Sequence, residues 1–280
     1  MSGPAAKTWA VVLAAGEGRR LAALTRGVPK QYCSFGRPGC MLEWAVERAL
    51  GVTTAERLVT VVACEHESFF RPLAGTLGTI VEQPSNRGTA AGILLPLLGI
   101  CERDPDATVL LLPSDHFVAD EAALQEGLAL AAARARADRK RTFLLGIEPD
   151  GPDTEYGWIV PSEGDRVAAF VEKPGAPRAA ELFAAGALWN GFMLASSARA
   201  LVALFSRALP GLLRSFREAH GRADRERALD NLYAFLPPTD FSRDVLSTCS
   251  GDLGLVRAPA CGWTDLGTPA RLLGLLERAV

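Results

Sequence analysis

The chain has 280 residues, 49% of them hydrophobic, and its 30 basic and 32 acidic residues give a formal net charge of −2. This length suits one large α/β domain or two small ones, with ample apolar material for a core. The near-neutral charge excludes a general attraction to nucleic acid or to a membrane surface, so an anion must be bound by a local group of residues.

The amino terminus and the cysteines favour a cytoplasmic location. The first residues, MSGPAAKTW, lack the apolar stretch of a signal peptide. The longest uncharged run, 88–101, is too short to span a bilayer and contains Pro96. The six cysteines show neither a CxxC pair nor metal-ligand spacing. We therefore expect most of them to be small core residues in a reducing compartment.

Strands and helices alternate in the first half of the chain. Apolar or β-rich runs predict strands at 9–14, 58–63, 79–81, 108–112 and 142–147. Helical patterns predict helices at 41–50, 65–74 (interrupted by Pro72), 89–101 (with Thr89 near its cap) and 121–137. This alternation is typical of a three-layer α/β/α fold with a Rossmann-like, mixed and mostly parallel sheet. Ligands of such sheets bind beyond the carboxyl ends of the strands, which places residues 16–18, the loop 83–88 and Asp115 on one rim.

The second half of the chain is more mixed. Its patterns predict strands at 155–160, 167–171, 188–194 and 253–257. Helices are predicted at 178–185, in several pieces between 196 and 234, and at 269–279. No repeat, low-complexity tract or linker divides the sequence, which favours a single domain over residues 1–280.

The stretch 13–31, LAAGEGRRLAALTRGVPKQ, has the character of a polyphosphate-binding loop. Where a strand ends in Gly16 and Gly18, bare backbone N–H groups can approach an anion, and Arg20 and Lys30 add positive charge. A dinucleotide fingerprint would need a glycine at Leu21, and the chain has no Gly-Lys pair for a P-loop. The structural alternative is an ordinary glycine-rich turn with solvated arginines.

Two aspartates are candidate magnesium ligands. Asp115 ends an apolar strand, where its carboxylate either holds Mg²⁺ shared with substrate phosphates or caps the next turn. Asp265, within WTDLGT, is either the second carboxylate that such a site needs or a turn residue. We interpret His116, next to the first aspartate, as a structural histidine.

Each of three further positions can be explained either by a function or by the structure alone. Lys173 follows a strand in FVEKP and either meets a monophosphate as a point charge or is solvated. Gly157, between Tyr156 and Trp158, either lets a ligand approach the backbone or stands beside core aromatics. Asn190 must satisfy a buried amide, with a sugar hydroxyl or with a nearby backbone group.

The order of these motifs across residues 13–268 resembles the sugar-phosphate nucleotidyltransferases, and most closely the mannose-1-phosphate guanylyltransferases. Gln31 after Pro-Lys and His116 after Pro-Ser-Asp favour this mannose and GTP branch. The blocks that carry the resemblance are LAAGEGRRL, VPKQ, EQPSNRGTA, LLPSDH, EYGWI, FVEKP, WNGFM and GWTDLGT.

The resemblance implies a role for each matching residue. The half up to about residue 150 would bind the nucleotide, and the half from about 151 the sugar phosphate. The implied nucleotide-binding residues are Leu13, Ala14, Ala15, Gly16, Gly18, Arg20, Lys30, Gln83, Pro84, Gly88, Thr89, Ser114 and Asp115. The implied sugar-phosphate residues are Gly157, Glu172, Lys173 and Asn190, and Asp115 and Asp265 would share Mg²⁺. Arg20, Lys30, Asp115, Lys173 and Asp265 would carry the catalysis.

The implied reaction is in-line attack of a sugar-1-phosphate oxygen on the α-phosphorus of a nucleoside triphosphate, giving a nucleotide sugar and pyrophosphate. The nucleophile is already an anion, so the reaction requires positive charge and alignment rather than a general base. With only 12 residues after Thr268, we expect none of the isomerase or β-helix extensions of longer relatives. A homodimer is compatible with the resemblance.

The sequence departs from this family pattern at informative places. Arg19 replaces a small hydroxyl residue, Ala23 a proline, and Gly88 the asparagine usual in the guanylyl branch. A glutamate usual in the branch is absent after FSRD. Other substrate pairs therefore stay open: dTTP or UTP with glucose-1-phosphate, or CTP with a phospho-alcohol. A non-catalytic nucleotide-sugar sensor is the alternative from another class, whereas the missing third glycine argues against a nicotinamide oxidoreductase.

Overall fold

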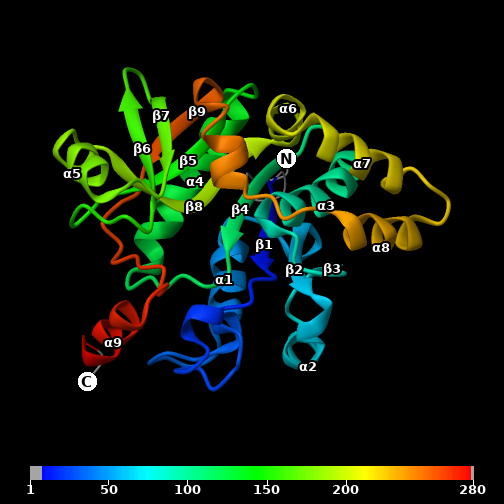
Figure 1. The fold of residues 1–280 in the computed structure, drawn as a ribbon, viewed down its shortest axis with the longest axis horizontal. Helices are drawn as coiled ribbons and strands as arrows, with labels where there is room; N and C mark the ends of the chain where they lie inside the picture. The colour runs from blue at the N-terminus through cyan, green and yellow to red at the C-terminus, as the bar shows by residue number, and fades with distance from the viewer. Residues whose placement is uncertain (1–7, 279–280) are drawn as a thin grey trace.

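The computed structural model describes residues 8–278, and Figure 1 shows a central sheet with helices on both sides. The strands are β1 (Thr8–Ala14), β2 (Leu58–Ala63), β3 (Thr79–Gln83), β4 (Thr108–Pro113), β5 (Thr142–Ile147), β6 (Gly157–Ser162), β7 (Arg166–Glu172), β8 (Leu188–Ser197) and β9 (Leu253–Arg257). The α-helices are α1 (Met41–Leu50), α2 (Glu67–Phe70), α3 (Gly88–Arg103), α4 (Glu121–Ala137), α5 (Ala176–Ala184), α6 (Ala198–Ala208), α7 (Pro210–His220), α8 (Arg225–Phe235) and α9 (Pro269–Arg278).

Within the described residues these strands form one nine-stranded mixed sheet in the order β3-β2-β1-β4-β8-β5-β9-β7-β6. The neighbours from β3 to β4 are all parallel, and so are β5 and β9. Strand β8 runs antiparallel between β4 and β5, and β6 and β7 form an antiparallel pair. A strand from the second half thus lies in the middle of the sheet, which joins the two halves through continuous hydrogen bonding.

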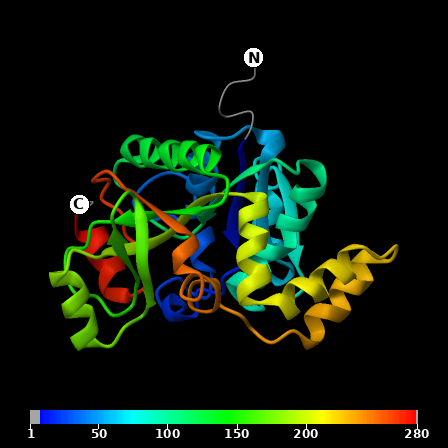
Figure 2. The same ribbon diagram turned by 90° about the horizontal axis from the view of Figure 1, so that it is seen from above.

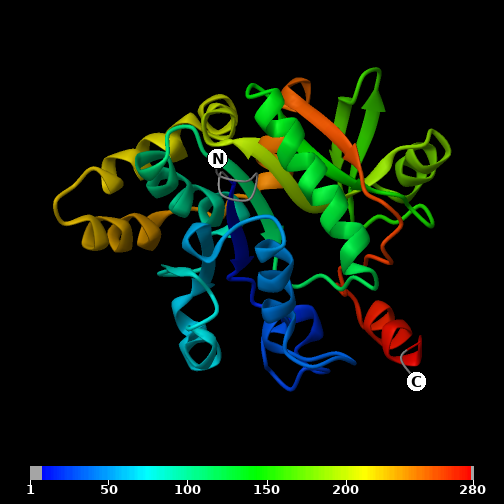
Figure 3. The ribbon, with the colours of Figure 1, turned by 180° about the vertical axis from the view of Figure 1, so that it is seen from behind.

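The alternation of side chains along β1 explains the three layers. Trp9 and Val11 face a core made with α3, α6 and α7, whereas Ala10, Val12 and Ala14 face a second core made with α1 and α4. Figure 2 shows α4 and α6 on opposite sides of the sheet, and Figure 3 shows α4 and α1 from behind. The predicted three-layer α/β/α architecture with a mixed sheet is confirmed. The expectation of a mostly parallel sheet is wrong: among the described strands four pairings are parallel and five antiparallel, because β8 and the β6–β7 pair run against their neighbours.

Most predicted elements agree with the structure, and the differences have local causes. The predicted helix at 65–74 is one α-helical turn, α2, between two 3-10 turns, and Pro72 lies in the second of these. The strand predicted from residue 155 begins at Gly157. Residues 196 and 197, predicted as helical, belong to the long strand β8. The sequence patterns do not predict the π-helical turn at Phe241–Leu246.

Some expectations concern residues outside the described range. Residues 1–7, which include most of the segment examined for a signal peptide, lie outside it, as does Ala279 at the end of the predicted final helix. None of the helices within 8–278 combines the length and apolar character that a membrane span requires. The cysteines are all free thiols: Cys40, Cys249 and Cys261 are buried, Cys33 and Cys101 are half-buried, and Cys64 is exposed.

Candidate active site

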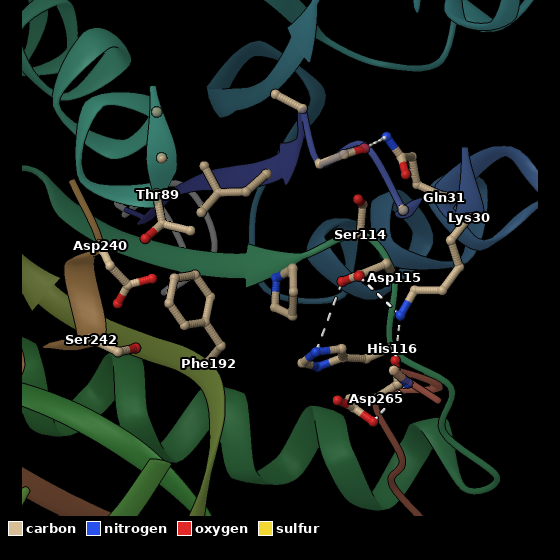
Figure 4. Close-up of a pocket in the computed structure, with 18 of the residues that line it drawn as sticks. Lys30, Gln31, Thr89, Ser114, Asp115, His116, Phe192, Asp240, Ser242 and Asp265 are labelled. Carbon is tan, nitrogen blue, oxygen red and sulfur yellow. Dashed lines mark hydrogen bonds and ion pairs between the residues drawn. The ribbon is translucent and has the colours of Figure 1, made fainter. Parts of the chain in front are cut away.

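A cavity of about 420 Å³ lies beyond the carboxyl ends of β1, β3 and β4, and residues from both halves of the chain line it. Figure 4 shows part of its lining, with Lys30 and Gln31 on the right and Thr89, Asp240 and Ser242 on the left. The predicted site residues on its wall are Leu13, Ala15, Gly16, Gly18, Arg20, Lys30, Gln83, Gly88, Thr89, Ser114, Asp115, Gly157, Glu172, Lys173, Asn190 and Asp265. The rim expected from strand order is therefore the rim of this cavity.

Two predicted nucleotide-binding residues do not line the cavity. The side chain of Ala14 is fully buried in the core on the α1 and α4 face, because it alternates with Leu13 along β1. Pro84 is half-buried in the loop after β3 and is absent from the cavity wall. Ala14 contributes to the glycine loop through its backbone only, because its carbonyl accepts a hydrogen bond from Gln31.

The glycine loop after β1 is held open by Gln31. The Gln31 side-chain amide donates to the carbonyls of Ala14 and Gly16, both at 2.9 Å, and is itself buried. A Cβ at Gly16 would meet nothing within 4 Å, whereas one at Gly18 (φ +65°) would lie 3.0 Å from the Lys30 nitrogen. The loop therefore keeps bare backbone facing the cavity and passes close to Lys30.

Lys30 connects the two loops that carry the predicted metal ligands. Its ammonium lies 3.0 Å from Asp115 Oδ2 and also donates to the backbone carbonyl of Asp265. Lys30 is only 5% exposed. Burial would raise the pKa of the Asp115 carboxyl, but the Lys30 charge, the neighbouring His116 and hydrogen bonds to the carboxylate together bring the pKa below its ordinary value. Asp115 is thus an anion held against a fixed cation on the cavity wall.

The carboxylate of Asp265 is fixed by donors from three directions. The Tyr156 hydroxyl (3.1 Å), the Gly267 amide (2.9 Å) and the Arg271 guanidinium (2.8 Å) all donate to Asp265 Oδ1. Burial raises the pKa of this carboxyl, yet the Gly267 N–H and the Arg271 charge help to bring it below its ordinary value. Asp265 is therefore ionised and rigidly placed.

The donor set of the cavity fits a magnesium ion shared with substrate. Asp115 and Asp265 supply carboxylate oxygens on the same wall, as Figure 4 shows. Residues 8–278 hold no cluster of three or more His, Cys, Asp or Glu side chains that could bind a metal by themselves. A metal bound here would complete its shell with water and phosphate oxygens, which is the habit of Mg²⁺.

The sugar-phosphate half presents an acidic and a basic group side by side. Glu172 is 15% exposed at its side chain, and Lys173, with φ +44°, places its ammonium 3.6 Å from Glu172 Oε1. Burial and the nearby Asp240 carboxylate raise the pKa of Glu172. A Cβ at Gly157 would stand 2.6 Å from Glu172 Oε2. The glycine thus makes room for the Glu172 carboxylate within the cavity wall.

Asn190 shapes the next turn of the wall. Its Oδ1 accepts from the backbone N–H of Phe192 at 3.1 Å, so the amide finds the backbone partner that is one of the two expected alternatives. Phe192 adopts φ +52° and points its ring into the cavity beside Thr89 and Asp240 (Figure 4). Non-glycine residues with positive φ are uncommon and gather at functional sites, and Phe192 and Lys173 both face this cavity.

Arg20 and Glu155 form an ion pair between the two halves at the cavity. The guanidinium lies 2.8 Å from Glu155 Oε2, and the two side chains are 61% and 47% exposed. Such an exposed pair contributes little to stability. A phosphate could therefore replace Glu155 as the partner of Arg20 at small cost.

The segment 239–241 packs against the amino-terminal end of α3 and is hydrogen-bonded to it. Ala90 N–H donates to the Thr239 carbonyl, and Thr89 Oγ1 accepts from the Phe241 N–H at 2.8 Å. Arg87 is the amino-terminal cap residue of α3 and makes no side-chain cap bond, so Thr89 holds a neighbouring segment rather than its own helix end. Gly88, at φ +83°, would place a Cβ 2.2 Å from the Thr239 oxygen.

Replacing Gly88 by alanine is expected to destabilise the protein by about 3 kcal/mol, because a positive φ and a close backbone contact both penalise a Cβ. Denaturant unfolding of the purified protein measures this. Gly211→Ala, where a Cβ would meet nothing within 4 Å, is the matched control and should change stability little. Equal stabilities of the two variants would contradict the expectation.

Several residues on the wall are not among the predicted site residues. They are Gln31, Val61, Asn86, Gly92, Pro113, His116, Glu155, Tyr156, Phe192, Asp240, Ser242, Trp263 and Gly267. Tyr156 and Trp263 lie in the motif blocks EYGWI and GWTDLGT, so their closeness in sequence to Gly157 and Asp265 could have indicated that they line the site. Asp240 and Ser242 flank Phe241, the first residue of the unpredicted π-helical turn, and Ser242 belongs to the FSRD segment, which the resemblance does not assign to the site. Arg271, which holds Asp265, lies in the final helix six residues later.

A sequence model of the nucleotidyl transferase family matches residues 9–278, and the chain belongs to this family. Among curated proteins, it is 32% identical to the xanthan biosynthesis protein XanB of Xanthomonas campestris pv. campestris (strain B100), with 96% of this chain and 59% of that protein covered. It is 30% identical to the mannose-1-phosphate guanylyltransferase ManC of Salmonella typhimurium, with coverages of 94% and 58%. The chain thus spans less than two thirds of the length of these relatives.

A solved structure has the same fold. The crystal structure of mannose-1-phosphate geranyltransferase from Thermus thermophilus superposes with a TM-score of 0.83 at 31% identity. The match covers 93% of this chain and 76% of that chain. The predicted family resemblance and fold class are both confirmed.

Proposed function

We propose that this protein transfers a nucleotidyl group from a nucleoside triphosphate to a sugar-1-phosphate, forming a nucleotide sugar and pyrophosphate. The observation that carries the proposal is the single cavity in which the glycine loop and Lys30 of one half share the wall with Glu172 and Lys173 of the other. GTP and mannose-1-phosphate are the favoured substrates, because a relative named mannose-1-phosphate guanylyltransferase covers 94% of this chain.

The chemistry needs two anions to meet in line. The sugar-phosphate oxygen attacks the α-phosphorus and pyrophosphate leaves on the opposite side, so no proton has to be removed from the nucleophile. The work of the protein is to offset the repulsion between the anions and to align them. The cations in the cavity, Arg20, Lys30 and Lys173, supply this charge from both halves of the chain.

Lys30 is the best placed of these cations to act on the reacting phosphate. Its ammonium is fixed by Asp115 and by the Asp265 carbonyl, so the charge is positioned before substrate arrives. Asp115 and Asp265 would hold Mg²⁺, which when bound would neutralise phosphate charge and polarise the α-phosphoryl group. The glycine loop would direct its free N–H groups to the remaining phosphate oxygens.

The sugar would lie against the second half of the chain. Glu172 would accept hydrogen bonds from sugar hydroxyls, Lys173 would meet the phosphate, and Asn190 would shape the wall between them through Phe192. Gln83 and the backbone of Gly88 would lie against the base. The nucleotide-binding half up to about residue 150 and the sugar-phosphate half from about 151 would thus meet at the cavity.

Pyrophosphate release tests the proposal. The purified protein is incubated with Mg²⁺, mannose-1-phosphate and each nucleoside triphosphate in turn, and then with GTP and other sugar phosphates. Release with GTP and mannose-1-phosphate is expected. If pyrophosphate were released only with another pair of substrates, the proposed reaction would stand and the proposed substrate specificity would be wrong. Binding of nucleotide without release from any pair would overturn the proposal in favour of a sensor.

Lys173→Ala is expected to raise KM for the sugar phosphate about tenfold, with little change in kcat, because a charge-assisted contact to the monophosphate is lost. Steady-state kinetics with each substrate varied separately measures the effect. Lys140→Ala, at an exposed lysine that does not line the cavity, is the control. If KM rose for the triphosphate alone, the assignment of the two half-sites would be wrong.

The proposed substrates also indicate the cellular compartment of the protein. Nucleoside triphosphates, Mg²⁺ and the free thiols of this chain favour the cytoplasm, which we propose as its compartment. A homodimer stays a prediction, and sedimentation of the purified protein tests it.

A further inference from the structure

The two loops that carry Asp115 and Asp265 are joined to each other by a backbone bridge. Phe117 N–H donates to the Thr264 carbonyl at 2.8 Å, and Thr264 N–H donates back to Phe117 at 2.9 Å. Each bridging residue lies within two positions of one of the aspartates. The separation between the two carboxylates is therefore set by contacts between these loops, and not by the sheet alone.

A side-chain contact stands beside this bridge. Trp263 Nε1–H donates to His116 Nδ1 at 3.1 Å, and the two rings meet edge to face at 5.1 Å with an interplanar angle of 86°. The residues are 147 positions apart in the sequence. Since Nδ1 accepts the indole proton, the neutral imidazole carries its own proton on Nε2.

That proton is directed towards the proposed metal site. His116 Nε2 lies 3.8 Å from Asp115 Oδ1, while Lys30 lies 3.0 Å from Oδ2 of the same carboxylate. Figure 4 shows the Asp115 carboxylate between these two groups. The 3.8 Å separation is longer than a hydrogen bond, so the Nε2–H group acts on the Asp115 carboxylate as a nearby dipole, while the bond from Trp263 holds the imidazole in place.

We propose that His116, held by Trp263, is a positioning residue that orients the Asp115 carboxylate and keeps the loops of Asp115 and Asp265 in register for one cation. This inference rests on the proposed function, which places the metal between these carboxylates. A cation shared by two carboxylates from separate loops is bound well only if the carboxylates are already oriented. Partners outside the ligand shell that orient ligands typically change metal affinity or activity by about 10–100-fold.

The test removes the indole donor and keeps the ring. Trp263→Phe should weaken Mn²⁺ binding in the presence of GTP, followed by electron paramagnetic resonance of free Mn²⁺, by about tenfold. It should lower kcat at fixed Mn²⁺ and leave KM for the sugar phosphate unchanged. Trp9→Phe is the matched control, because it also removes an indole donor, but the Trp9 indole donates to Asp104 and neither residue lines the cavity.

Variants at His116 separate positioning from packing. His116→Gln keeps an oxygen that can accept from Trp263 and an N–H that can face Asp115, and should retain most of the Mn²⁺ affinity. His116→Leu fills similar space without either group and should reproduce the loss. A double variant, Trp263→Phe with His116→Leu, should bind Mn²⁺ no more weakly than His116→Leu alone, since both changes break one path.

The opposite results would overturn the inference. They are wild-type Mn²⁺ affinity in Trp263→Phe, or equal losses in His116→Gln and His116→Leu. A wild-type protein that binds Mn²⁺ with GTP but releases no pyrophosphate from any pair would instead overturn the proposed function, and the comparison of variants by Mn²⁺ binding would still stand.

Discussion

Asp115→Asn is expected to lower kcat for pyrophosphate release by about 10³-fold, equivalent to about 4 kcal/mol of transition-state stabilisation. The amide is nearly the same size as the carboxylate but carries no charge, so it binds a divalent cation poorly and replaces the ion pair with Lys30 by a weaker, uncharged contact. The fold should persist, because the Asp115 side chain lies on the cavity wall and is 40% exposed.

Kinetics under saturating substrates and a thermal melt together measure this prediction. Asp106→Asn removes a carboxylate that is 76% exposed and does not line the cavity, and should leave kcat unchanged. A rate for Asp115→Asn near that of the wild type would remove this residue from the metal site. Loss of a cooperative thermal transition in Asp115→Asn would show that the ion pair between Asp115 and Lys30 is needed for folding.

Lys30→Gln is expected to have an effect of similar size, a fall in kcat of about 10³-fold. The ammonium is buried and contacts both metal-ligand loops, so its loss removes the fixed charge and the link between the loops. Lys30→Arg should fail to restore the rate, because a guanidinium is larger than the space around a side chain that is 6% exposed. Lys140→Gln is the control at an exposed lysine.

The double variant shows whether Lys30 and Asp115 act as one unit. If they do, Lys30→Gln with Asp115→Asn should be slowed about as much as either single variant, since losses within a unit are not additive. Losses that multiply would indicate independent roles. A Lys30→Gln variant with near-normal kcat and a raised KM for triphosphate would assign the lysine to ground-state binding only.

Prediction from the sequence is most successful where the signal is local. The helices Met41–Leu50 and Glu121–Ala137 and the strands Leu58–Ala63 and Thr142–Ile147 begin and end at the predicted residues. Each of these segments has an apolar pattern that fits one kind of element. The strand predicted from residue 155 starts later in the structure because Glu155 and Tyr156 turn towards the cavity, where they contact Arg20 and Asp265.

The sequence identifies the site residues as types but does not reveal their contacts. It marks Gln31 only as typical of one branch of the family, whereas the Gln31 amide supports the glycine loop. It leaves open whether Gly157 admits a ligand or stands beside core aromatics, and in the structure the Glu172 carboxylate fills the space beside this glycine. It indicates a structural role for His116, which is buried and bonded to Trp263 but also faces the cavity.

The sequence by itself determined most of the strands and helices, the family and most of the residues on the cavity wall, because periodicity and motif blocks depend on residues close together in the chain. Tertiary structure alone decided where β8 inserts and which groups meet across the cavity. The contact of Lys30 with the Asp265 carbonyl joins residues 235 positions apart. A buried charged group must be paired, and the partners available to Lys30 are the groups that the folded sheet brings to the same rim. These partners are distant in the sequence, so no local pattern predicts the contact.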